Sequence, residues 1–447
     1  MVTIAQIIPT LDEGGAERTT LEMTEAITAR GWRAVVVTQG GRLTPRVEAL
    51  GGTIITLPMA SKNPLVMMRN ARRLKTLVTD EKIDLFHARS RAPAWSTLWA
   101  SRRTQIPFIT TFHGAYGGGS RLKRQYNSVM VRADRVIANS HFTAEALVAG
   151  YGDLVPGLRP GLRERLTVIP RGVDLASFSP DAVTAARCDA LLSQWYQEAK
   201  MDASQTRPFT IVMPARPSAW KGHAVALNAL ARMKTLMTGQ AQTQAGQGRT
   251  FRLIFVGGDD GSTALPSDKI SGGRGHKPGL ATKNAEFGQA LRRLAKDIGV
   301  ADLVHFSGHE TDMPAAYGAA DAVIMPSTRP EAFGRVAVEA GAMGVPVVAS
   351  DHGGARETVR PGKTGFLVPP GDSDALADAL ATLATMPAPA RRALGAAARE
   401  HVTRHFSSAS MTAATLGVYE AALGGGGAHT HPASPAPALP ADPFSGE

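Results

Sequence analysis

Two glutamates lie eight residues apart in the stretch PEAFGRVAVEA, which runs from residue 330 to 340. Glu331 follows a β-rich run, and Glu339 has apolar neighbours in a helical pattern that starts near Phe333. Eight residues make a little over two turns of helix, so both carboxylates could project from one side. A helix-terminal carboxylate with a surface ion pair is the alternative. Carboxylates accept hydrogen bonds well from the paired hydroxyls of a ribose or sugar, and both interpretations stay open at this point.

A second group of chemically capable residues lies in PARPSAWKGH, directly after the first strand pattern of the second half. Arg216 and Lys221 are five residues apart there and could grip a diphosphate, neutralising charge on a departing group. Two basic residues in a loop are more often solvated, and that alternative stays open at this point.

A glycine turn follows the first strand pattern of the chain. Gly14 and Gly15 precede a helix whose first turn holds Glu17, and such a turn lets backbone amides approach a phosphate at the helix N-terminus. A plain tight connection is the alternative, since the full G-x-G-x-x-G pattern is absent. The PGKTG stretch at Pro361 does not form a P-loop, because Glu357 replaces its first glycine and a strand follows.

The elements that must position these residues alternate between short β-rich runs and helical patterns. Runs such as TIAQIIP, AVVVTQ, LFHARS and PFITTFH recur before Asp174, and FTIVMPAR, RLIFVGG and AVIMPS recur after Arg207. This alternation predicts an α/β protein with two doubly wound, Rossmann-like parallel sheets in tandem. Ligands of such sheets bind beyond the carboxyl ends of the strands, so the two domains should face a shared cleft.

We expect domains at residues 1–180 and 207–385, joined by a linker at 181–206. Residues 386–423 should form helices that pack back toward the first domain, and the Gly/Pro/Ala-rich tail at 424–447 should be disordered. Two polar, glycine-rich stretches, from Thr238 and from Gly257, are expected to be mobile loops.

Composition narrows the classes of protein. The single cysteine, Cys188, excludes an intramolecular disulfide and a cysteine-cluster zinc site. A net charge of +11 favours anionic partners, but zinc-finger spacing is absent and the aromatic content is 6%, so nucleic acid is not an expected partner. Neither chain end reads as a signal peptide or a bilayer-spanning segment, which predicts a cytoplasmic protein.

The order of these motifs resembles the retaining glycosyltransferases of the large GT4 family. The resemblance rests on GGAER, on the Arg and Lys of ARPSAWKG, and on the E-x7-E formed by Glu331 and Glu339; it extends through GGARETVRPGKTGFLVPPGD. It implies the GT-B fold, in which the second domain holds a nucleotide sugar and the first holds the acceptor.

The resemblance also implies roles for individual residues. Glu331 would contact donor-sugar hydroxyls and Glu339 the ribose hydroxyls. The diphosphate or sugar would be met by the amides at Phe333 and Gly334, by the side chains of Arg216 and Lys221, and by Gly14 and Gly15 of the other domain.

His113 in TFHG matches the family histidine near the anomeric carbon, although a lone histidine at a strand end is more often structural. The family retains configuration by front-face attack, so no general base is assigned. The donor is expected to be a UDP- or GDP-linked sugar, with no further cofactor and no metal. Pro217 departs from the residue common in the family and leaves the geometry of its loop open, whereas Arg335 after Phe-Gly leaves donor preference open.

Basic residues in the first half suggest the acceptor. MMRNARRLKTLV and SRLKRQYNSVMVR are basic and partly amphipathic, and Arg89 and Arg91 follow a strand, which suits an anionic glycolipid or an anionic membrane surface. An ordinary helix facing its sheet is the alternative for the first stretch. The sequence of this region resembles that of enzymes of lipopolysaccharide core and envelope polysaccharide synthesis. This resemblance implies a peripheral position on the inner face of the cytoplasmic membrane. A GT-B epimerase acting on a UDP-sugar and a non-catalytic nucleotide-sugar-binding protein are the other two hypotheses.

Overall fold

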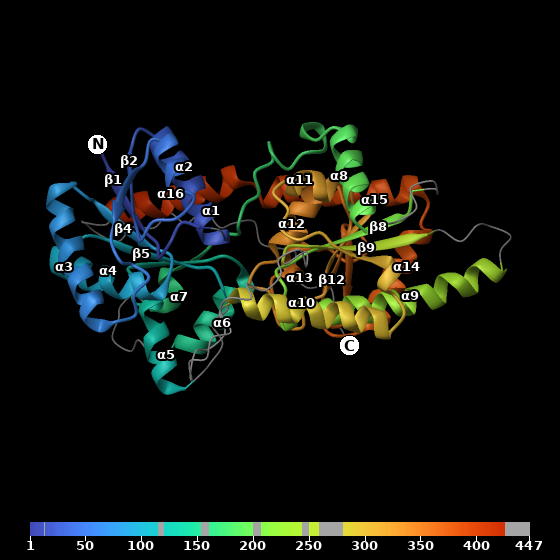
Figure 1. Ribbon diagram of the computed structural model, residues 1–447. Helices are drawn as coiled ribbons and strands as arrows, with labels where there is room; N and C mark the ends of the chain where they lie inside the picture. Colours follow the sequence, from blue (N-terminus) through green and yellow to red (C-terminus); the bar gives the residue numbers. More distant parts are fainter. Residues whose placement is uncertain are drawn as a thin grey trace, which may run out of the picture.

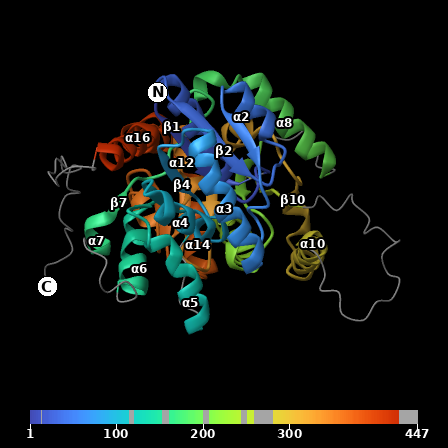
Figure 2. The same cartoon turned by 90° about the vertical axis from the view of Figure 1, so that its left-hand side faces the viewer.

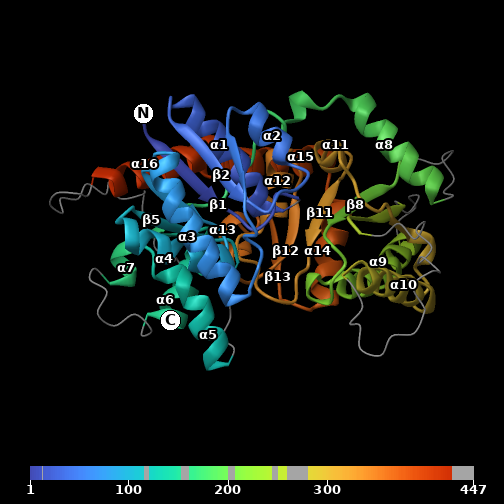
Figure 3. The ribbon, with the colours of Figure 1, turned by 60° about the vertical axis from the view of Figure 1, so that its left-hand side comes forward.

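A computed structural model describes residues 1–12, 14–114, 120–152, 161–199, 207–243, 250–258 and 280–424, without the side chains of 239–243 and 280–284. Its two parallel sheets lie in separate lobes (Figures 1 and 3). The expected pair of doubly wound sheets is therefore confirmed. The expected tail and most of the stretch that begins at Gly257 lie outside the described residues.

The N-terminal sheet has seven strands in the order β3-β2-β1-β4-β5-β6-β7. They are β1 (Thr3–Ile7), β2 (Arg33–Thr38), β3 (Thr53–Thr56), β4 (Leu85–Ala88), β5 (Phe108–Phe112), β6 (Arg135–Ala138) and β7 (Leu166–Val168). The helices between and after them are α1 (Gly15–Ala29), α2 (Thr44–Ala49), α3 (Pro64–Asp80), α4 (Arg91–Thr104), α5 (Arg121–Asn127), α6 (His141–Tyr151) and α7 (Leu162–Arg165). The strand order reverses beside β1, which places a switch point between β1 and β4.

The C-terminal sheet has six strands in the order β10-β9-β8-β11-β12-β13. They are β8 (Phe209–Pro214), β9 (Phe251–Val256), β10 (Val304–Phe306), β11 (Ala322–Met325), β12 (Val347–Ser350) and β13 (Gly365–Val368). Its helices are α8 (Ala185–Glu198), α9 (His223–Thr243), α10 (Leu280–Asp297), α11 (Met313–Gly318), α12 (Arg335–Ala342), α13 (Ala355–Thr358) and α14 (Ser373–Thr385). Because α9 continues to Thr243, the start of the stretch from Thr238 is helical and our loop prediction there is wrong.

The last two helices belong to different lobes. α15 (Ala388–His405) packs on α12, whereas α16 (Ser408–Gly424) packs beside α1 in the N-terminal lobe. Tyr419 of α16 is fully buried in one cluster with Ile4 and Met23, and Figures 1 and 2 show α16 beside β1. The chain thus returns to its first lobe after completing the second.

Each sheet is covered on both faces, as strands with uninterrupted burial require. In the C-terminal lobe, one cluster packs α8, α11 and α12 against the sheet, and another packs α9, α10 and α14 against the opposite face. This arrangement holds the carboxyl ends of the strands, where the predicted motifs lie, on a rigid base.

His223, at the start of α9, makes the stability of this lobe dependent on pH. Burial beside the rings of Phe255 and Phe287 lowers its pKa to about 4. In the unfolded chain His223 takes up a proton near pH 6.5, whereas in the folded chain it does so only near pH 4. The free energy of unfolding therefore decreases as the pH falls from 6.5 to about 4. We expect His223 alone to account for roughly 3 kcal/mol of that loss. Urea unfolding at pH 7.5 and 4.5 checks this, and His223→Leu should show a smaller difference; an unchanged difference would contradict it.

Candidate active site

Lys221 and Glu331 meet at the carboxyl edge of the C-terminal sheet. Lys221 follows β8, and its Nζ donates to Glu331 Oε1 at 2.6 Å while lying 4.3 Å from the centre of the Trp220 ring. Ser327 Oγ donates to the same carboxylate oxygen at 2.6 Å. Both charged side chains are mostly buried, with exposures of 19% and 13%. The structure therefore brings together two residues that belong to separate sequence motifs. Arg216, which shares a motif with Lys221, has an exposed side chain.

Glu339, in α12, is buried with protein partners on both carboxylate oxygens. Tyr317 donates its hydroxyl to Oε2 at 2.8 Å, and Arg335 donates Nε to Oε1 at 2.7 Å. Arg18 of the N-terminal lobe lies 3.7 Å away. The partner expected for a carboxylate among apolar residues is thus present, and the role of Glu339 toward ribose stays a prediction.

The loop between Glu331 and Gly334 packs against a second glycine pair, Gly353 and Gly354. Gly353 has a φ of 60°, and a Cβ there would lie 2.4 Å from Glu331 O. Phe333 is buried and packs edge-on against Phe406. Gly334, with a φ of 89°, precedes the first residue of α12, so the helix starts two residues later than the predicted Phe333.

Gly354 provides a steric test of this support. Its φ is ordinary, but a Cβ would lie 2.4 Å from Phe333 Cα. We expect Gly354→Ala to displace the loop, costing about 1–3 kcal/mol of stability as an overpacking change does, and to weaken donor binding. Thermal unfolding and nucleotide titration check this. Gly417→Ala on α16, where a Cβ meets nothing within 4 Å, is the control; equal behaviour of the two variants would contradict the prediction.

The glycine turn of the N-terminal lobe is covered by charged side chains. Gly14 precedes α1 with a φ of 151°, and a Cβ there would lie 2.4 Å from Glu17 Oε2. Burial raises the pKa of Glu17, although hydrogen bonds from the backbone amides of Glu17 and Ala16 oppose that shift. A carboxylate therefore lies against the helix N-terminus that we predicted to face a phosphate.

His113 lies after β5 and is held by Arg171, which follows β7. Arg171 Nη2 contacts His113 Nδ1, and burial together with this guanidinium keeps the pKa of His113 well below its usual value. Since a guanidinium only donates, His113 Nδ1 is the acceptor and the proton of the neutral ring lies on Nε2. Arg171 Nη1 also lies so near Gly15 that a Cβ there would be 1.9 Å from it.

The two lobes touch at the start of α6. The carboxylate of Glu357 accepts the backbone amides of His141 at 2.9 Å and Phe142 at 2.8 Å. Ser140 and Thr143 donate their hydroxyls to Ala332 O, in the loop that follows Glu331. These bonds keep that loop against the N-terminal lobe.

Comparisons with known proteins agree with this geometry. The family described as Glycosyltransferase Family 4 matches residues 13–177, and that described as Glycosyl transferases group 1 matches residues 197–401. A glycosyltransferase structure from Rickettsia africae is 29% identical, with a TM-score of 0.76 over 94% of this chain and 98% of that one. The chain belongs to the GT4-like glycosyltransferases. Its two-lobe architecture is the GT-B fold.

This GT4-like chain spans less than two thirds of the length of several curated relatives that it matches. A D-inositol 3-phosphate glycosyltransferase from Acidothermus cellulolyticus is 31% identical over 72% of this chain and 64% of its own length. Three further relatives of that name are matched over 46%, 52% and 57% of their lengths. Anabaena HepE, solved in complex with UDP, is 22% identical with a TM-score of 0.73, covering 94% of this chain and 100% of that one, and shares the fold.

Sequence reasoning missed three charged residues of this GT4-like site. Arg171 lies in PRGV, at the end of a strand pattern, and this stretch matches no catalytic or binding motif. Glu357 was considered only because it replaces the first glycine of a P-loop, and Arg335 only because it leaves donor preference open. The available signal was position: Arg171 comes directly after a strand, at the edge where ligands bind.

A pocket of the N-terminal lobe lies at the ends of β1, β3 and β4. Its lining residues are Pro9, Ala60, Lys62, Ser90, Arg91, Ala92, Lys123, Tyr126 and Asn127. Arg91 donates to Asn127 Oδ1 at 3.0 Å. The three cations and the lack of a lining carboxylate give this pocket a positive potential. Arg89, expected at the cleft, is instead 3% exposed and donates to Gln6 at 2.8 Å.

Proposed function

We propose that the protein transfers a hexosyl group, with retention of configuration, from a nucleotide-diphosphate sugar to an anionic glycan or glycolipid. The observation that carries this proposal is the Lys221–Glu331 pair, 2.6 Å apart at the strand ends. The lysine can neutralise the departing diphosphate while the carboxylate accepts hydroxyls of the sugar. Arg216 adds a second positive charge, so the proposal includes no metal or further cofactor.

For the donor, we favour a UDP-linked sugar over a GDP-linked one. HepE, which shares the fold, was solved with UDP and with UDP-glucose. Glu339 would accept the ribose hydroxyls, and Phe333 and Gly334 would present backbone amides to the diphosphate at the start of α12. Gly14 and Gly15 would approach from the other lobe after Glu17 moves away from the helix N-terminus.

For the acceptor, we propose the basic pocket lined by Lys62, Arg91 and Lys123. Exposed apolar side chains occur close to it in the chain: Leu65 is 75% exposed and Leu122 is 84% exposed. Apolar residues beside cations suit a membrane of anionic lipids that holds a glycolipid substrate. The proposed setting is therefore envelope polysaccharide or lipopolysaccharide core synthesis on the inner face of the cytoplasmic membrane. None of the described helices combines the length and apolarity needed to span a bilayer.

Calorimetric titration with UDP, GDP and their common sugar conjugates tests the donor. Saturable binding of UDP and a UDP-sugar supports the proposal, and GDP-selective binding would overturn the UDP preference. Incubation of the UDP-sugar alone separates the alternatives: conversion to another sugar indicates an epimerase, and binding without turnover on any glycolipid acceptor indicates a non-catalytic protein.

Flotation with phosphatidylglycerol vesicles tests the membrane surface. We expect binding that salt weakens and that the double variant Leu65→Ser, Leu122→Ser reduces. Equal flotation with phosphatidylcholine vesicles would contradict a role for the cations.

A further inference from the structure

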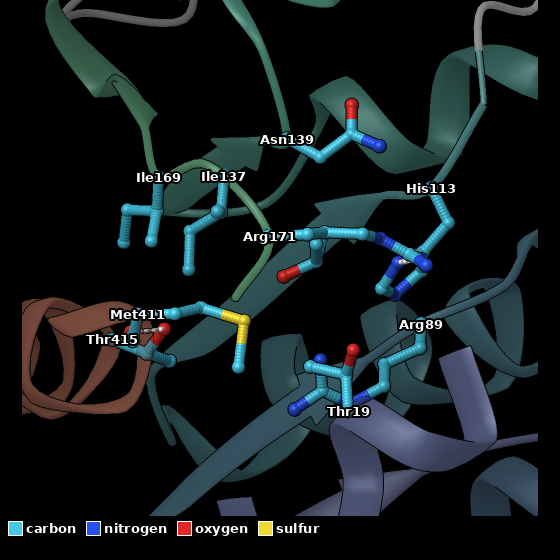
Figure 4. A pocket seen from close by; sticks show the side chains of 10 residues that line it. Thr19, Arg89, His113, Ile137, Asn139, Ile169, Arg171, Met411 and Thr415 are labelled. Carbon is cyan, nitrogen blue, oxygen red and sulfur yellow. Dashed lines mark hydrogen bonds between the residues drawn. The ribbon is translucent and has the colours of Figure 1, made fainter. Parts of the chain in front are cut away.

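A small cavity of the N-terminal lobe lies where four neighbouring strands end. Arg89 follows β4, His113 follows β5, Asn139 follows β6 and Arg171 follows β7, and all four line the cavity. Met411 of α16 closes one side. Figure 4 shows Arg171 and His113 lying against each other, with Arg89 below them and Asn139 above. The cavity is distinct from the basic pocket proposed above for the acceptor.

Polar atoms without partners gather around this cavity. Among the described residues, nine buried side-chain nitrogen or oxygen atoms lack a hydrogen-bond partner. Four of them belong to the lining residues: Arg89 Nε, His113 Nε2, Asn139 Oδ1 and Arg171 Nε. Arg89 and Asn139 are 3% and 2% exposed, so water at the protein surface does not satisfy them. Buried polar groups normally have partners, so such a concentration marks a place suited to a polar ligand or an ordered water.

The character of these atoms identifies the class of ligand. The Nε atoms of both arginines only donate, and His113 Nε2 carries the ring proton because Nδ1 accepts from Arg171. Asn139 can present either its oxygen or its NH2 group. Three donors on residues that line one cavity, two of them on guanidinium groups, suit an oxyanion.

The charge balance supports the same class. Two guanidinium groups line the cavity, and none of its lining residues is a carboxylate. The carboxylates that act on Arg171 are those of Glu22 and Glu17, which lie outside the lining. Buried charge requires compensation, and an anion entering beside Arg89 and Arg171 would supply it.

We propose that this cavity binds one oxyanionic group, a carboxylate or a phosphate, carried by the acceptor, and that Arg171 determines this specificity. The proposal rests on the proposed glycosyl transfer. The acceptor is favoured over the donor diphosphate because every lining residue belongs to the N-terminal lobe or to α16, which packs on it. Contact of Arg171 with both Gly15 and His113 would place the bound group beside the site of transfer.

Inorganic phosphate, titrated calorimetrically into the full chain at saturating UDP, tests this proposal. Saturating UDP fills the donor side, so phosphate then reports on the remaining oxyanion site. We expect Arg171→Gln to weaken phosphate binding by about tenfold or more, as loss of a charged hydrogen bond does, while UDP affinity stays within twofold. Lys296→Ala, at an exposed position of α10, should leave phosphate binding unchanged. Equal phosphate affinity in wild type and Arg171→Gln would overturn the proposal, and loss of UDP affinity in Arg171→Gln would assign the oxyanion to the donor and overturn the acceptor assignment.

Asn139→Asp keeps the test valid if Arg171→Gln does not fold. It places a carboxylate of the same shape in the cavity lining that both guanidinium groups share, so it should raise the melting temperature and abolish phosphate binding. A lower melting temperature with phosphate affinity unchanged would contradict an oxyanion site. If wild type binds no UDP, the proposed donor fails, and the phosphate comparison without UDP still decides the oxyanion site.

Discussion

Replacing Lys221 with alanine is expected to lower kcat by about 10²–10³, the usual effect of removing one preorganised charge from a developing anion. The lysine is 19% exposed and lies over the Trp220 ring, so its ammonium group is positioned before the donor arrives. An interaction that strengthens as the diphosphate departs should lower kcat and kcat/KM equally. Steady-state kinetics with a UDP-sugar and a glycolipid acceptor measure both values.

Two further variants separate charge from structure at this position. Lys221→Ala also leaves the Glu331 carboxylate to its hydrogen bond from Ser327, so Lys221→Arg, which keeps the charge, should retain more activity than alanine does. Lys296→Ala, at an exposed position of α10, is the control and should behave as wild type. Wild-type kcat in Lys221→Ala would remove the proposed role at the leaving group.

Replacing Glu339 with alanine is expected to raise the donor KM by about 10- to 100-fold, with a smaller effect on kcat. Hydrogen bonds to a charged group contribute about 1.5–3 kcal/mol, and each 1.4 kcal/mol is a tenfold change. The carboxylate is already oriented by Tyr317 and Arg335, so ribose hydroxyls would meet a fixed acceptor. Calorimetric titration of UDP measures the loss without turnover.

Glu339 also has a structural contribution that the experiment must separate. Its carboxylate helps to raise the pKa of Arg335, which burial alone would lower, and alanine would leave that guanidinium without its partner. Glu339→Gln preserves the shape and the contact with Tyr317, so its melting temperature should exceed that of alanine while UDP binding stays weak. Glu286→Ala, exposed on α10, is the control. Unchanged UDP affinity in both Glu339 variants would remove the ribose assignment.

The two-sheet architecture and the position of the motifs could be predicted from sequence because they depend on local patterns. Alternating β-rich and helical runs specify strands and helices within a few residues of chain, and parallel sheets expose ligand sites at the carboxyl ends of their strands. The sequence therefore predicts Lys221 and Glu331 at one edge of the sheet, and the structure adds the hydrogen bond between them. The helix boundary at Gly334 and the continuation of α9 to Thr243 were mispredicted because local propensity is weakest at helix ends.

Only the tertiary structure decided which distant residues complete the site. Arg171 meets His113 and Gly15 because β7, β5 and α1 converge at one edge of the sheet, a proximity that no spacing along the chain encodes. Glu357 caps α6 across the lobes, and α16 returns to cover β1 and α1. The sequence by itself determined the fold class and the donor motifs, since these follow from short-range periodicity. Packing between segments tens of residues apart, 58 in the case of Arg171 and His113, assembled the cations around His113, because burial and charge compensation act through space.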